Sequence, residues 1–147
     1  DHHVRAVFEQ GPGLRELSDL APLRQWLLSR LMWNPDLDQE ALTGEFLNGY
    51  YGTAAPFVRE YMELGYQAVD ASGMQLRCNA SVKWLSLDTL LKMRQVFDKA
   101  EEAVGKEPEL LDRVRTAGLK MRIHRREENC GPPLIWKSCS MRLIKLS

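Results

Sequence analysis

Residues 31–52, LMWNPDLDQEALTGEFLNGYYG, constrain the fold more than any other stretch because they end one helix and start another within a few residues. Pro35 has no amide hydrogen and disfavours helical backbone at the preceding Asn34, so a helix that arrives from the N-terminal side ends there. Asp38 is a good N-cap, and Glu40 adds negative charge to the positive end of the next helix. The stretch therefore predicts two helices joined by a short break.

A second break is expected at the end of the second helix, because Gly49 and Gly52 both disfavour a continuing helix. Thr53 then follows as an N-cap candidate for a third helix. Apolar residues recur at spacings of three and four along most of the chain, which is typical of helices with one buried face. Together with capping and proline signals, this periodicity predicts five helices, over about residues 21–33, 39–50, 53–73, 86–104 and 108–124.

Only one segment has the character of a β-strand. Val4 to Phe8 bring β-branched and aromatic residues together and are followed by Gly11, Pro12 and Gly13. Residues 125–147 contain Gly-Pro-Pro and scattered apolar residues without a clear period, so we expect a poorly ordered tail. The predicted fold class is mainly α, with one short N-terminal strand.

Composition excludes several classes of protein. With 44% hydrophobic and 27% charged residues, the 147-residue chain is typical of one globular domain. Its 20 basic and 20 acidic residues balance, so we expect no field that attracts nucleic acid or an anionic membrane. No apolar run is long enough for a membrane span, and no signal segment is evident, which leaves the localisation open. Because the sequence lacks an initiator Met, we expect a fragment or a processed product.

The cysteines and histidines do not predict a metal centre or a disulfide framework. Cys78, Cys130 and Cys139 are odd in number and form no CxxC pair. His2 and His3 lack the i, i+4 spacing that places two ligands on one helix face, and His124 is isolated. We therefore predict no metal and no cofactor. The basic run MRIHRR, residues 121–126, is interpreted as a solvated helix end.

Three segments together resemble a known family. They are FEQG, the long run LLSRLMWNPDLDQEALTGEFLNGYYGTAAPFVREYM, and LSLDTLLKMRQVFDKAEEAV with ELLDRVR. Over roughly residues 4–117 the chain is similar to the C-terminal part of a bacterial domain-of-unknown-function family, number 4838, associated with carbohydrate-active proteins. A similar helix break follows the barrel in family 67 α-glucuronidases, which resemble this family more distantly and combine a (β/α)8 barrel with a helical C-terminal region.

The resemblance implies a division of the chain into three parts. Residues 1–34 would be the last strand and helix of a truncated barrel, and residues 35–124 the helical region appended to it. Residues 125–147 match nothing in the family and form an atypical tail. The break at WNPDLD would then turn the chain from the outer ring of the barrel into the separate helical layer.

Candidate site residues are few. Glycoside hydrolysis needs two carboxyl groups across the scissile bond, and barrel enzymes take them from the C-terminal ends of several strands. Only Glu9 and Gln10 stand at such an end here, where they either contact sugar hydroxyls in the intact parent or form a solvated strand terminus. We predict no catalytic residue. Trp33, Tyr50 and Tyr51 are able to stack on a sugar, but their position favours packing.

Two functions follow as expectations. The first is a C-terminal helical scaffold portion of a glycoside-hydrolase-like protein, inactive on its own, which meets carbohydrate only through the intact parent. The exposed edge of the strand at residues 4–8 would also favour self-association. The alternative is a free-standing helical module that binds another protein. Neither reading includes nucleic acid or a membrane as a partner.

Overall fold

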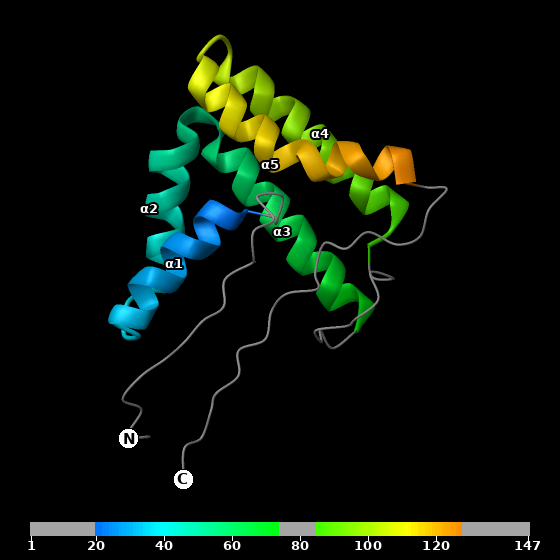
Figure 1. Ribbon diagram of the computed structural model, residues 1–147. Helices are drawn as coiled ribbons and strands as arrows, with labels where there is room; N and C mark the ends of the chain where they lie inside the picture. The colour runs from blue at the N-terminus through cyan, green and yellow to red at the C-terminus, as the bar shows by residue number, and fades with distance from the viewer. Residues whose placement is uncertain (1–19, 74–84, 128–147) are drawn as a thin grey trace.

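The computed structural model describes residues 20–73 and 85–127, with only the helical backbone for residues 119–127. Every element in these ranges is helical (Figure 1). They are α1 (Ala21–Trp33), α2 (Gln39–Tyr51), the 3₁₀ helix η1 (Gly52–Ala54), α3 (Ala55–Ser72), α4 (Leu87–Val104) and α5 (Pro108–Glu127). The mainly α prediction is confirmed, whereas the expected strand at residues 4–8 and most of the tail lie outside the described residues.

The helices pack as two connected groups (Figure 1). Helices α1 and α2 lie side by side, and α4 and α5 form the expected hairpin, which packs on α3 through α4. Helix α2 joins the groups because it contacts α1, α3 and α5. One buried cluster runs through both groups, formed by Leu20, Leu23, Leu47, Tyr51, Ala54, Ala55, Val58, Tyr61, Met93, Val96, Phe97, Ala100, Val104 and Val114.

Local sequence signals place the first residues of α2 and α4 where they were predicted. The Asp38 carboxylate accepts hydrogen bonds from the backbone amides of Glu40 and Ala41, at 2.8 and 3.2 Å. The Ser86 hydroxyl likewise accepts from the amide of Thr89, at 3.1 Å. These bonds satisfy amides of the first turn that have no partner within their own helix.

The second break lies where it was predicted, but Thr53 has another role than the predicted one. Helix α2 passes Gly49 and ends at Tyr51, within one residue of the predicted end at about residue 50, and Gly52 follows it with a φ of +53°. Thr53 does not cap α3, because it lies within η1 and its hydroxyl donates to the carbonyl of Ala103 at 3.0 Å. The turn is therefore held by a contact with a distant helix.

Glycine also sets how closely α4 and α5 approach. A Cβ atom at Gly118 would lie 3.1 Å from ring atoms of Phe97, which is closer than side chains normally pack. Phe97 in turn packs on Tyr61 of α3, with 4.9 Å between their ring centres. The absence of a side chain at Gly118 thus lets α5 approach the α3–α4 core.

Candidate functional site

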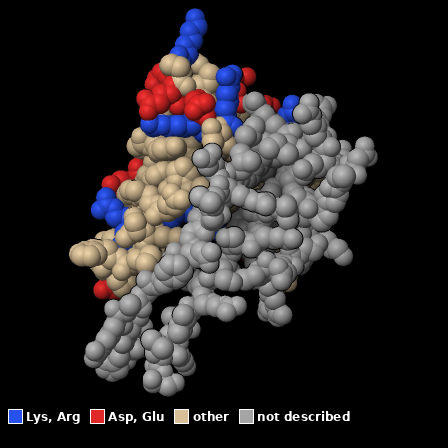
Figure 2. Space-filling model, viewed as in Figure 1, with Lys and Arg blue, Asp and Glu red and all other residues tan. Residues whose placement is uncertain are grey.

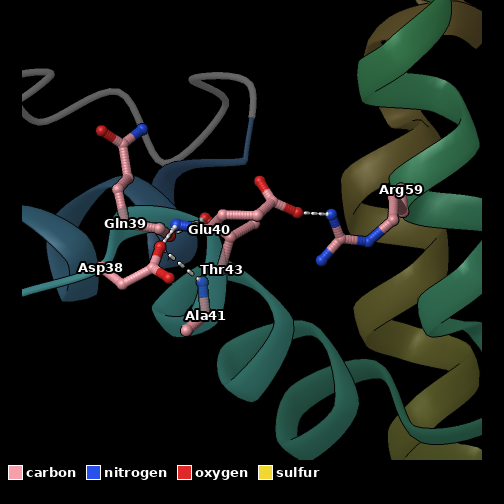
Figure 3. Close-up of polar contacts among 6 residues, drawn as sticks. All are labelled: Asp38, Gln39, Glu40, Ala41, Thr43 and Arg59. Carbon is pink, nitrogen blue, oxygen red and sulfur yellow. Dashed lines mark hydrogen bonds and ion pairs between the residues drawn. The ribbon is translucent and has the colours of Figure 1, made fainter.

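The first break, between α1 and α2, is built from short-range hydrogen bonds. Asn34 has extended backbone, which ends α1, and its side-chain carbonyl oxygen accepts from the amide of Asp36 at 3.1 Å. Asp38 then caps α2 through its carboxylate (Figure 3). Asn34 and Asp38 therefore act on the backbone of the turn, and the predicted N-cap role of Asp38 is confirmed.

An ion pair connects this turn to the next group of helices. Figure 3 shows the Glu40 carboxylate, in the first turn of α2, reaching the guanidinium of Arg59 on α3. The Glu40 side chain is well exposed and that of Arg59 is partly exposed. Because solvent screens such a pair, it orients α2 against α3 more than it stabilises the fold.

Three apolar side chains at the first break face solvent, and we name them the exposed turn: Met32, Trp33 and Leu37. Trp33 is 92% exposed, Met32 45% and Leu37 37%. The prediction that Trp33 is a packing anchor is therefore wrong. Trp33 is the last residue of α1, and the break turns the chain away before any described element covers it. Figure 2 shows mostly tan surface, with a few acidic and basic side chains among it, along the left edge of the molecule above the grey residues.

Aromatic rings from α1 and α2 form a row, and an arginine lies at each end of it. Trp26 lies 5.5 Å from Phe46, and Phe46 is stacked on Tyr50 at 5.0 Å between ring centres. Arg30 lies over Trp26 at 5.2 Å, and Arg113 over Tyr50 at 4.5 Å. This aromatic row joins α1, α2 and α5, and each contact is of a type that stabilises packed rings and cations.

The packing role predicted for Tyr50 and Tyr51 is confirmed. Tyr51 is 1% exposed, and Tyr50 is half-buried in the aromatic row. Their rings meet edge to face, with 5.0 Å between the centres. Tyr51 is enclosed, and Tyr50 uses its ring to pack against Phe46 and Arg113.

The second break is held by the α4–α5 hairpin. Arg113 on α5 donates to the carbonyl of Tyr50 at 2.9 Å, while Thr53 donates to the carbonyl of Ala103 on α4. Both carbonyls belong to the last turn of a helix, where they have no amide partner within that helix. A side chain of α5 thus satisfies a carbonyl at the end of α2, and a side chain of η1 satisfies a carbonyl at the end of α4. Leu110 on α5 also lies against Gly52, where a Cβ atom would be 3.0 Å from its side chain.

The predicted site residues Glu9 and Gln10 lie outside the described residues, as do His2 and His3. Within residues 20–73 and 85–118, no three His, Cys, Asp or Glu side chains come together in a way that could hold a metal ion. None of the helices in the same ranges has the length and apolar character needed to cross a membrane. The contact of Arg113 with the carbonyl of Tyr50 was not predicted, because the two residues are 63 positions apart and no local sequence signal marks the pair.

These features define a helical domain in which the helical chain is broken twice between α1 and α3. The comparison with known families finds a match to this part of the chain. The model of the family described as Domain of unknown function (DUF4838) matches residues 1–63. The family predicted from the sequence is thus confirmed, over a shorter span than the one expected: the match covers α1, α2, η1 and the first half of α3. No curated protein and no solved structure matches the chain.

Proposed function

We propose that this chain is the C-terminal helical scaffold portion of a carbohydrate-active, glycoside-hydrolase-like protein. The observation that carries the proposal is that polar and aromatic residues within residues 1–63, the segment that matches the family, are engaged in contacts within the protein. Asp38 caps a helix, Glu40 pairs with Arg59, and Tyr50 is held by Arg113. The first contact fixes the start of α2 and the other two join α2 to α3 and to α5, as expected of a part that supports a site formed elsewhere.

The link to carbohydrate rests on the sequence resemblance to barrel glycosidases. In that arrangement Val4 to Phe8 are the last barrel strand, and α1 is the helix that follows it. Glu9 and Gln10 then stand at the C-terminal end of the strand, where barrel proteins place groups that contact substrate. The chain contributes one edge of a sugar site and no complete acid–base pair.

A panel of glycosides tests this proposal, including uronic-acid and N-acetylhexosamine substrates. The panel is applied to the chain and to a longer protein that carries it behind a barrel, each with and without Glu9→Gln. We expect turnover by the longer protein alone, reduced by the substitution. Turnover by the isolated chain would overturn the scaffold role, and an active longer protein unaffected by Glu9→Gln would remove Glu9 from the site.

A second candidate function is a free-standing helical module that binds another protein. The exposed turn favours it, because a nearly fully exposed Trp33 beside Met32 and Leu37 is typical of contact surfaces. The gene sequence upstream of Asp1 separates the two candidates. Several strand–helix units with acidic residues at the strand ends support the scaffold, whereas a start codon near Asp1 without a barrel supports the binding module.

A further inference from the structure

We draw no further inference here: the strongest candidate, the exposed turn of Met32, Trp33 and Leu37 between α1 and α2, is an apolar surface patch, and nothing in the structure shows what covers it.

Discussion

Arg113 holds Tyr50 at two points, donating a hydrogen bond to its carbonyl at 2.9 Å while its guanidinium lies 4.5 Å from the centre of the Tyr50 ring. The contact places a positive charge at the C-terminal end of α2, where the helix dipole is negative. Tyr50 belongs to the segment that matches the family, whereas Arg113 lies beyond it. The family stretch therefore packs against helices that its own segment does not contain.

Replacing Arg113 with alanine should lower the free energy of unfolding by about 1–3 kcal/mol, since it removes a charged hydrogen bond and a cation–π contact. Arg113→Lys keeps the charge but loses the flat guanidinium that lies over the ring, so it should recover only part of the loss. Urea unfolding monitored by circular dichroism measures both variants. The exposed Arg94→Ala on α4 is the control, and an equal loss at Arg94 would show that the Tyr50 contact has no particular weight.

Two glycines in the same motif should respond in opposite directions. Gly52→Ala should destabilise the protein by about 1–3 kcal/mol, because its φ of +53° is unfavourable for alanine and the added Cβ meets Leu110. Gly49→Ala should stabilise it by about 0.5–1 kcal/mol, because Gly49 lies inside α2 with open space around it. Thermal unfolding compares the two variants. Destabilisation by Gly49→Ala would mean that Gly49 does not lie inside a regular helix, in contradiction to the bounds of α2.

The cap at the start of α2 should contribute less than the ring that packs beside it. Asp38→Ala should cost about 1 kcal/mol, and Asp38→Asn should be nearly neutral because asparagine is also a good N-cap. Phe46→Ala should cost about 2–3 kcal/mol, below the usual range for a core phenylalanine because Phe46 is only half-buried. Chemical denaturation gives all three values. Equal small losses at Asp38 and Phe46 would contradict the packing of the aromatic row.

Trp33→Ala should change the free energy of unfolding by less than about 0.5 kcal/mol, because the side chain is exposed and little burial is lost. Tyr51→Ala is the contrasting variant and should cost about 3–5 kcal/mol, since that ring is buried. Acrylamide quenching provides a second measurement: removal of Trp33 should eliminate a readily quenched part of the fluorescence. A loss of several kcal/mol at Trp33 would show that the ring packs on the protein after all.

Local chemistry was sufficient to predict most of the fold. Pro35, Asp38 and Ser86 act on neighbouring backbone, so their effects on helix ends follow from the sequence alone. Gly49 lies inside α2, as in the predicted helix over about residues 39–50, because a glycine costs only about 1 kcal/mol inside a helix, which packing of the residues around it readily exceeds. Local effects of this size settle a boundary only where no tertiary contact opposes them.

The candidate site depended on tertiary contacts and was predicted less well. Thr53 was expected to cap α3, but the carbonyl of Ala103 offers its hydroxyl a partner that no sequence window contains. The exposure of Trp33 and the pairing of Arg113 with Tyr50 are likewise set by where the helices meet. Periodicity identifies residues on one face of a helix but does not identify what covers that face.

The most direct test of whether the five helices fold as one unit is a comparison of the whole chain with a version that ends after Gly73. The shorter version keeps the segment that matches the family and all of α3, but loses the α4–α5 hairpin, with Arg113, Ala103 and the buried Phe97. If the five helices form one unit, the whole chain unfolds in one cooperative thermal transition and the shorter version shows no cooperative transition and a weaker helical signal. A cooperative transition of the shorter version at the same temperature would show that α1, α2 and α3 fold without the α4–α5 hairpin, and would contradict a single folding unit.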